Sequence, residues 1–406
     1  MKVLVLNAGS SSQKSKLYEL NDNPSEAAPK ALWEAYADWT HTPDNAEITI
    51  SNIHGQRQQY TVHVTSRAAI IEHILSTLWS GSTQIIARPQ EIDVVGHRVV
   101  HGGPDLYEST HITPEVQATI QRLASFAPLH NPDNLEGIEA AQRVLGQTPQ
   151  VAVFDTAFHH HLPPEVRWYP GPYDWYNDGI RRYGFHGISH QYCMQRSASI
   201  LGRAPADVRL INCHLGNGCS LAAIKDGHSV DTTMGFTPLE GLMMGGRSGT
   251  VDPGILIYLQ REKGMDADQL EKLLNKESGL KGISGVSADM RQVMKAAQEG
   301  NEQAQLARAL YSYRLRYFIG AMLTSLEGVD VLTFTGGVGE NDAQLRSSTC
   351  AGLKFLDLAL DEQKNADSPA DAEISTPQSK VRVLIVHTEE DWQIAKESST
   401  VLKKLG

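Results

Sequence analysis

The chain has 406 residues and a formal net charge of −11 at pH 7, with 41% apolar and 20% charged residues. This composition excludes an intrinsically disordered protein, and the length suggests roughly two to three domains. The acidic balance, with no clustered Lys and Arg, argues against a general nucleic-acid-binding or anionic-membrane surface.

Membrane insertion and secretion are not expected either. No apolar stretch approaches the ~18–20 residues of a membrane span, and the first apolar run turns polar at Asn7, too early for a signal peptide. We therefore expect a soluble, cytoplasmic protein. The four cysteines form no CxxC pair and are expected to be reduced. The histidines at 159–161 are a weak metal motif, because three consecutive side chains cannot all face one ion.

Strand-like runs alternate with helical patterns along the chain, which is typical of an α/β protein. The apolar runs that predict strands lie at residues 2–7, 93–100, 150–154, 208–214, 329–335 and 381–387. A helix is predicted over residues 66–80, and Thr113-Pro114 predicts the start of another. The last helix has Thr388 as its cap and three acids, residues 389–391, at its positive end.

A weak internal repeat relates the two halves of the sequence. Near the start, a strand ends in the glycine and serine turn 7–12 and a second strand-like run follows. Near the middle, the strand 210–214 ends in the turn 215–220 and again a second run follows. The offset is about half the chain length, as duplication of one domain would produce, and it puts the domain boundary roughly between residues 150 and 200.

These turns suit phosphate binding, since glycine admits close backbone approach and serine adds hydroxyl donors. They are not Walker loops, because the first turn leads into a strand and no GxxxxGK[ST] is present. An ordinary hairpin is the alternative for Gly9–Ser12 alone. A third glycine turn, at 335–341, follows an apolar strand, opens a helix and has room for a flat base.

Two arginines stand in glycine-rich segments, Arg98 in residues 96–103 and Arg247 in the mobile-looking segment 245–249. A guanidinium matches a carboxylate or phosphate bidentately. A surface salt bridge is the alternative for either one. Asp155 follows an apolar strand, where ligand-binding carboxylates or helix caps occur. His186 and Glu390 are further candidates, with a structural histidine and a helix-end acid as their alternatives.

As a set, these segments resemble the acetate kinases, within the acetate and propionate kinase group of the actin-like ATPase superfamily. The resemblance extends from Val3 to Ala395 and rests on motifs in the family's order, namely VLVLNAGSSSQK, GHRVVHGG, APLHNP, VFDTAFH, RRYGFHGISH, LINCHLGNGCSLAA, SVDTTMGFTPLEGLMMGGRSG, LNKESGL, GISGVSADMR and FTGGVGEN. It implies reversible, Mg²⁺-dependent transfer of the ATP γ-phosphoryl group to acetate, giving acetyl phosphate and ADP, with Mn²⁺ as a possible substitute for Mg²⁺.

The resemblance also implies an α/β fold of duplicated actin-like (ribonuclease H-like) domains that flank a central cleft. The N-terminal domain is expected at residues 1–150, with the C-terminal helix 388–404 packed back onto it. The second domain, residues 151–387, is expected to carry the nucleotide site and the interface of a homodimer.

Site residues are carried over by position. Asn7 and Glu390 resemble the residues that hold or orient magnesium. Arg98, Asp155, His186 and Arg247 resemble the catalytic residues, with His130 in a supporting role. The acid is expected to bind at Arg98 and a small apolar pocket made by Val100, Leu129, Phe185 and Pro238. The nucleotide-binding positions are Ser10, Ser12, Lys14, His214, Leu215, Gly216, Asn217, Gly218, Asp289, Met290, Arg291, Gly337, Val338, Gly339, Glu340 and Asn341.

No general base is needed, because acetate is already ionised at pH 7, with a pKa of about 4.3 for a carboxyl of this type. A kinase for propionate or butyrate, or one using pyrophosphate, is the nearest alternative, and an actin-like or chaperone-like ATPase is the other. Valine at position 100 favours a small acid. Departures from the family pattern occur at Gly246, Thr250, Met290, Gly336 and Glu389.

Overall fold

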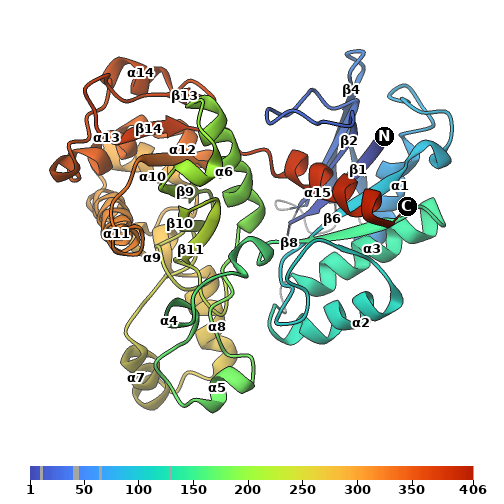
Figure 1. Ribbon diagram of the computed structural model, residues 1–406. Helices are drawn as coiled ribbons and strands as arrows, with labels where there is room; N and C mark the ends of the chain where they lie inside the picture. Colours follow the sequence, from blue (N-terminus) through green and yellow to red (C-terminus); the bar gives the residue numbers. More distant parts are fainter. Residues whose placement is uncertain (10–11, 40–44, 64–65, 128–129, 406) are drawn as a thin grey trace. The chain divides into compact units, whose positions relative to one another are not determined.

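A computed structural model describes residues 1–9, 12–39, 45–63, 66–127 and 130–405. The chain divides into two compact units, one of residues 1–158 and 389–406 and one of residues 159–388. Both are mixed α/β structures built on one sheet each (Figure 1). None of the described helices is long and apolar enough to cross a membrane.

Unit 1 is built on a sheet with the strand order β5-β4-β3-β2-β1-β6-β8-β7. The strands β1 to β5 form an antiparallel meander, and β6 and β8 continue the sheet parallel to β1. Their bounds are β1 Lys2–Ala8, β2 Ser12–Glu19, β3 Trp33–Asp38, β4 Asn45–Asn52, β5 Arg57–His63, β6 Val94–Val99, β7 Thr110–His111 and β8 Gln150–Phe154.

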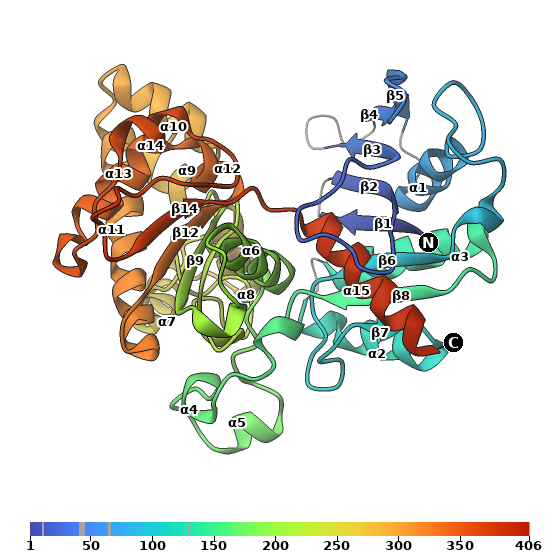
Figure 2. The ribbon, with the colours of Figure 1, turned by 45° about the horizontal axis from the view of Figure 1, so that its top comes forward.

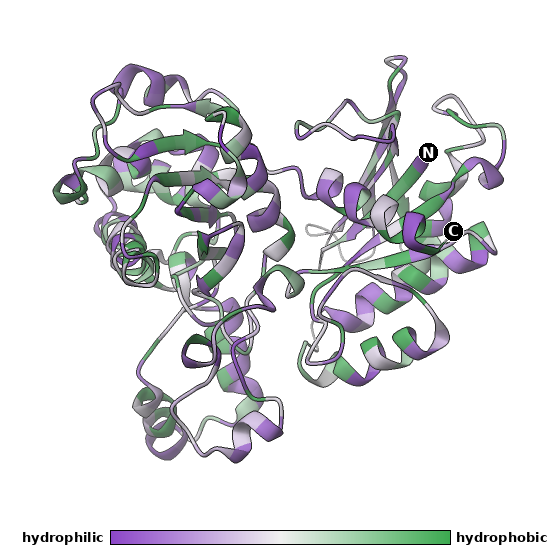
Figure 3. Cartoon of the chain, in the orientation of Figure 1, coloured by the Kyte–Doolittle hydropathy of each residue, from purple (hydrophilic) through white to green (hydrophobic). Residues whose placement is uncertain are grey.

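Helices cover both faces of this sheet. Their bounds are α1 Arg67–Ser76, α2 Pro114–Arg122, α3 Asn131–Leu145 and α15 Glu390–Leu405. Val95 packs in the apolar core with α1 and α3, whereas a side chain at the next residue, Gly96, would collide with Ile394 and Ser398 of α15. Side chains alternate along a strand, so α15 lies on the face opposite α3 (Figure 2). The helices α2 and α3 each carry both hydrophobic and hydrophilic residues (Figure 3). This is expected of helices that pack against the rest of a domain with one face.

Unit 2 has the strand order β11-β10-β9-β12-β14-β13. The bounds of its strands are β9 Leu210–Leu215, β10 Cys219–Lys225, β11 His228–Thr232, β12 Val331–Thr335, β13 Ala372–Glu373 and β14 Arg382–Ile385. Its helices are α4 Pro164–Arg167, α5 Asp174–Asn177, α6 Gly187–Ile200, α7 Pro253–Lys263, α8 Ala267–Lys276, α9 Gly279–Ser284, α10 Met290–Gln298, α11 Glu302–Leu326, α12 Gly336–Asn341, α13 Ala343–Ala351 and α14 Glu362–Asp367.

The two sheets share one topology in their central five strands. In both, a first strand pairs antiparallel with the second, and the second antiparallel with the third. On its other side the first strand pairs parallel with a later strand, which in turn pairs parallel with a last one, as in β3-β2-β1-β6-β8 and β11-β10-β9-β12-β14. The glycine turns after β1 and β9 therefore occupy equivalent places. This agrees with the duplication that the sequence repeat predicts.

The structure differs from the predicted elements at some boundaries. The helix predicted over residues 66–80 ends at Ser76, because the backbone N–H of Thr77 turns back to Ile74 and Leu75. The strand β8 pairs with β6, and the chain divides after residue 158, within the predicted boundary range of 150–200 and shortly after residue 150, the expected end of the first domain. The helix expected at 388–404 spans Glu390–Leu405 and packs on β1, β6 and β8 of unit 1.

Candidate active site

Within unit 1, Asn7 lies at the end of β1 and is nearly buried. Its side-chain Nδ2 donates a 2.8 Å hydrogen bond to Oδ1 of Asp391, in the first turn of α15. Since an amide nitrogen only donates, this bond leaves the amide oxygen of Asn7 as the acceptor for a ligand. Lys14 is exposed and lies opposite Asn7 on β2, and Ser12 begins that strand.

Lys16 neutralises the acids at the start of α15. Its Nζ lies 3.1 Å from Asp391 Oδ2 and 3.4 Å from Glu389 Oε2. Burial disfavours the ammonium, but Asp391, Tyr18 and Glu389 outweigh it and raise the pKa of Lys16. The unusual Glu389 is therefore engaged by a cation, and Glu390 is the carboxylate between the two that Lys16 pairs.

Arg98, near the end of β6, and Asp155, directly after β8, form a forked ion pair. Arg98 Nη2 donates to Asp155 Oδ2 at 2.7 Å, and Nε lies 3.2 Å from both carboxylate oxygens. Burial opposes the charge on Arg98, yet Asp155 and Glu390 raise the pKa of the guanidinium. Burial in turn raises the pKa of Asp155. Asn7, Arg98 and Asp155 thus share the carboxyl edge of three parallel strands, where ligands bind in α/β sheets.

This edge fits magnesium chemically. Asn7 and Glu390 offer hard oxygen ligands, and the part of the chain that the structure describes contains no group of three or more His, Cys, Asp or Glu placed to hold a metal ion. Mg²⁺ is commonly held by one or two carboxylates together with substrate phosphates and water, so a sparse set of protein ligands suits it.

Two other residues of unit 1 that are predicted for the site are Val100 and His130. Val100 is buried, and its backbone N–H donates to Asn134 Oδ1 at 3.1 Å. His130 precedes α3 at its N-cap position. Two of the predicted residues, Ser10 and Leu129, lie outside the described residues.

Within unit 2, the turn between β9 and β10 brings together the second set. Gly216 N–H donates to the carbonyl of Gly218 at 3.0 Å, which closes the turn around Asn217. His214 and His186 stack, with ring centroids 4.3 Å apart and planes at 29°. His186 has φ 56° as the N-cap of α6, which is uncommon for a residue other than glycine. This backbone bend presents the imidazole beside the turn.

His186, Gly218 and Arg247 meet at one place. A Cβ built on Gly218 would lie 3.4 Å from Nε2 and Cε1 of His186 and 3.6 Å from Nη1 of Arg247. The same Nη1 donates to the carbonyl of Pro238 at 3.3 Å. A histidine and a guanidinium therefore face the same glycine turn.

The segment that carries Arg247 is held firmly, despite its glycines. Backbone bonds tie Gly245 to Asn217, Ser248 to Leu274 and Ser278 to Gly246. Gly249 has φ 70° and lies so close to the carbonyls of Gly241 and Leu242 that no other residue fits. The unusual Thr250 accepts a 3.0 Å hydrogen bond from the backbone of Gly241. These contacts define the conformation of the segment, which is a loop without regular secondary structure.

The third glycine turn forms α12, as predicted. Gly336 has φ 77°, and its N–H donates to Oε1 of Glu340 at 2.9 Å. Oε2 of Glu340 pairs with His387 Nδ1 at 2.6 Å. Burial opposes the charge, but His387 lowers the pKa of Glu340. Glu340 thus holds the turn together, while Asn341 bonds its own helix at Gly337. The remaining members, Val338 and Gly339, lie within α12.

The segment 289–291 starts α10. Asp289 caps the helix by accepting from the N–H of Arg291, and the two side chains pair at 2.6 Å. Met290 is buried, whereas Arg291 is exposed. Leu215 and Phe185 are also buried in unit 2.

Lys16 is a contact of the site that its sequence motif does not indicate, because nothing around it in the chain differs from an ordinary strand. The run of histidines has a structural role at His159, whose ring lies 2.7 Å from Ser229 Oγ and 3.1 Å from the carbonyl of Phe185.

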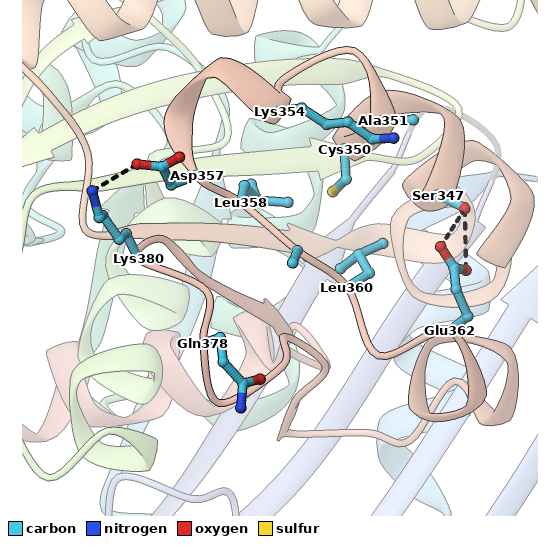
Figure 4. A pocket seen from close by; sticks show the side chains of 11 residues that line it. Ser347, Cys350, Ala351, Lys354, Asp357, Leu358, Leu360, Glu362, Gln378 and Lys380 are labelled. Carbon is cyan, nitrogen blue, oxygen red and sulfur yellow. Dashed lines mark hydrogen bonds and ion pairs between the residues drawn. The ribbon is translucent and has the colours of Figure 1, made fainter.

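A separate pocket of unit 2 lies beside α13 and α14, and it contains none of the predicted residues. Ion pairing of Lys380 with Asp357 and a hydrogen bond from Ser347 to Glu362 are formed in its wall (Figure 4). None of the residues predicted for the site lines it, so this pocket adds nothing to the candidate site.

Comparison with known proteins gives a consistent result over the whole chain. The model of the acetokinase family matches residues 2–396. An acetate kinase of Cyanothece sp. is 57% identical over 397 residues, which cover 98% of this chain and 97% of that protein. An acetate kinase of Gloeobacter violaceus is 58% identical over 399 residues and 98% of both chains.

Solved structures agree with the sequence relatives. The crystal structure of Porphyromonas gingivalis acetate kinase superposes with a TM-score of 0.89 at 42% identity, covering 99% of both chains. A propionate kinase from Francisella tularensis has the same TM-score at 36% identity, covering 98% of this chain and 99% of that one. The chain therefore belongs to the acetokinase family and is an ATP-binding kinase.

Proposed function

We propose that this chain transfers the γ-phosphoryl group of ATP reversibly to acetate, giving acetyl phosphate and ADP. The observation that carries the proposal is the group of His186, Gly218 and Arg247, in which two donors face a glycine turn in a chain of the acetokinase family. A direct in-line displacement by the carboxylate needs only positioning and charge stabilisation.

The chemistry brings two anions together, the carboxylate and the γ-phosphate. Arg98 of unit 1 grips the carboxylate, with its fork held in plane by Asp155. Arg247 and His186 of unit 2 donate to the oxygens of the moving phosphoryl group, where charge develops. Acetate is ionised at neutral pH, so no residue has to remove a proton from it.

Asn7 and Glu390 are the residues proposed to hold Mg²⁺, which lowers the charge on the phosphates when bound. The nucleotide phosphates bind along the turn 216–218 with His214, and at Ser10, Ser12 and Lys14. The adenosine binds at 289–291 and 337–341. Val100, Leu129, Phe185 and Pro238 are the positions proposed to recognise the methyl group of acetate, with His130 as a support.

Hydroxylamine trapping of acyl phosphate tests the activity directly. Purified protein is given ATP and Mg²⁺ with acetate, propionate or butyrate, and an acid-free sample measures ATP hydrolysis. We expect hydroxamate with acetate, a smaller signal with propionate, and loss of both when EDTA removes the metal. ATP consumption that does not depend on an acid would sink the proposal and favour an actin-like ATPase. In the reverse direction, formation of pyrophosphate from acetyl phosphate and phosphate, in place of ATP from acetyl phosphate and ADP, would identify the other alternative.

The protein is further proposed to be a homodimer through unit 2. Apolar side chains are exposed on two of its helices, α7 and α11, namely Ile255, Ile257, Tyr258, Leu306, Tyr313 and Tyr317. Large exposed apolar patches mark interaction surfaces. Light scattering after size-exclusion chromatography would give twice the mass of 44.5 kDa for a dimer.

A further inference from the structure

The start of α6 packs over the strands β9 and β10 through polar side chains. His186 and His190 are four residues apart, so they lie on one face of the helix start. On the sheet, Ser220 is paired with His214, and Asn212 lies two residues before His214 on the same face. Asn212, Ser220 and His190 are all fully buried. None of the three belongs to the proposed contacts with substrate.

These side chains form one continuous chain of hydrogen bonds. Asn212 Nδ2 lies 2.8 Å from Nδ1 of His190. Nε2 of His190 lies 2.8 Å from Ser220 Oγ. The same Oγ lies 2.9 Å from Nδ1 of His186. The chain thus runs from the buried interior of the sheet to the imidazole beside Gly218.

In the structure the nitrogen of the Asn212 amide faces His190, and this orientation sets the direction of every bond, because an amide nitrogen can only donate. His190 must accept at Nδ1. Burial lowers the pKa of His190 well below its ordinary value, so the ring is neutral and carries its hydrogen on Nε2. That Nε2–H donates to Ser220, whose single hydroxyl hydrogen is then donated to Nδ1 of His186.

We propose that Asn212, His190 and Ser220 are positioning residues that hold the neutral His186 with its hydrogen on Nε2. Nε2 is the atom that faces Gly218 and Arg247. In this tautomer His186 donates to a phosphoryl oxygen, whereas the opposite tautomer presents a lone pair to an anion. The inference rests on the proposed function, since it refines the part that His186 plays in phosphoryl transfer.

Ser220→Ala is the first test, because it removes one hydroxyl and breaks the chain next to His186. We expect kcat to fall roughly ten- to a hundredfold, the usual effect of losing a residue that orients a functional histidine, while KM for ATP stays within about twofold. Ser197→Ala is the matched control. Ser197 is equally buried, and its hydroxyl bonds Thr333 at 3.0 Å, away from the histidines. This control should keep the parent kcat.

The tautomer itself is read by NMR of protein labelled with ¹⁵N in its histidine rings, with the His186 signal assigned by its loss in His186→Gln. The parent and Ser197→Ala should show hydrogen on Nε2, and Ser220→Ala a mixture of both tautomers. Asn212→Ala, which removes the donor at the far end, should also give a mixture and provides an independent test where Ser220→Ala does not fold.

A His186 ring that keeps hydrogen on Nε2 in both Ser220→Ala and Asn212→Ala, or a parent ring with hydrogen on Nδ1, would overturn the inference. A loss of kcat in Ser220→Ala matched by Ser197→Ala would do the same, because it would reflect packing alone. The NMR result does not need turnover. If the parent protein showed no acetate-dependent activity, the proposed function would be wrong, but the NMR measurement would still test the tautomer of His186.

Discussion

Asn7 and Asp391 are joined by a buried 2.8 Å hydrogen bond although they lie 384 positions apart in the chain. The bond connects the end of β1 to the first turn of α15 within unit 1. It turns the amide oxygen of Asn7 toward the carboxyl edge of the sheet, and it anchors the helix turn that begins with Glu390. Asp391 thus orients both residues proposed to hold the metal.

Asp391→Ala should therefore weaken both folding and metal use. It removes the partner of the Asn7 amide and one of the two carboxylates paired with Lys16. We expect a loss of about 2 kcal/mol in the free energy of unfolding, measured by urea titration. The Mg²⁺ concentration for half-maximal activity should rise roughly tenfold, as is typical when a group that orients a metal ligand is lost.

Lys380→Ala provides the control for that experiment. Lys380 pairs with Asp357 at 2.7 Å, but both side chains are mostly exposed. An exposed pair of this kind contributes little to stability, so stability and Mg²⁺ dependence should stay near the parent values. Equal effects of the two substitutions would show that Asp391 has no special place in the structure.

The strands that carry the site could be predicted from sequence because they are buried on both faces. Runs such as 150–154 and 331–335 are buried at every position and mostly apolar, and their ends coincide with polar or glycine-rich segments. The strands β3 to β5 were not predicted. Residues of β5 alternate between exposed and half-buried, without a fully buried position, so the segment has no strong apolar signal.

The residues of the candidate site could be proposed from the sequence, but the contacts between them could not. Arg98 and Asp155 were each visible at the end of a strand, yet only the parallel pairing of β6 with β8 brings them together. Lys16 resembles any other charged residue of an edge or hairpin strand. Its role depends on α15, whose approach to β1 is set by packing at Gly96 and not by any local pattern near Lys16.

Stability should fall as the pH is lowered from about 6.5 toward 4, because two buried histidines stay neutral in the folded protein. Burial lowers the pKa of His97 and of His159 to about 4. The unfolded chain takes up these protons below its ordinary histidine pKa of about 6.5, whereas the folded protein does so only near 4. The contribution of these two histidines to stability is therefore complete above pH 6.5 and is lost as the pH falls from 6.5 to about 4.

Urea titrations at pH 7, 6 and 5 test this slope. Each such histidine contributes up to about 1.4 kcal/mol per pH unit near pH 5. His97→Gln keeps an amide donor toward Gln150, which lies 2.6 Å from Nε2 of His97 in the parent. As the pH falls, the free energy of unfolding of the variant should decrease more slowly than that of the parent, by about that amount per pH unit. Parallel curves for parent and variant would contradict the neutral state of His97.

Val100 should limit the size of the acid. The side chain is buried, and its backbone is fixed by Asn134, so the wall cannot move away easily. One methylene in such a pocket is worth ~1–3 kcal/mol. Val100→Ala should raise kcat/KM for propionate relative to acetate roughly tenfold. Val99→Ala is the control, since Val99 is equally buried but packs in the apolar core with Phe154. A ratio that changes equally in both variants would mean that position 100 does not touch the acid.

Arg247 should stabilise the transferring phosphoryl group rather than bind ATP. Arg247→Ala is expected to lower kcat by two or more orders of magnitude, roughly 3 kcal/mol or more, with far less change in KM for ATP. Arg247→Lys keeps the charge but loses the planar fork, so it should recover only part of the rate. Arg122→Ala, at an exposed pair with Asp105, should behave as the parent. Steady-state kinetics of the three variants and the parent tests these expectations. Full activity of Arg247→Lys would mean that the positive charge alone suffices. Full activity of Arg247→Ala would remove this residue from the mechanism.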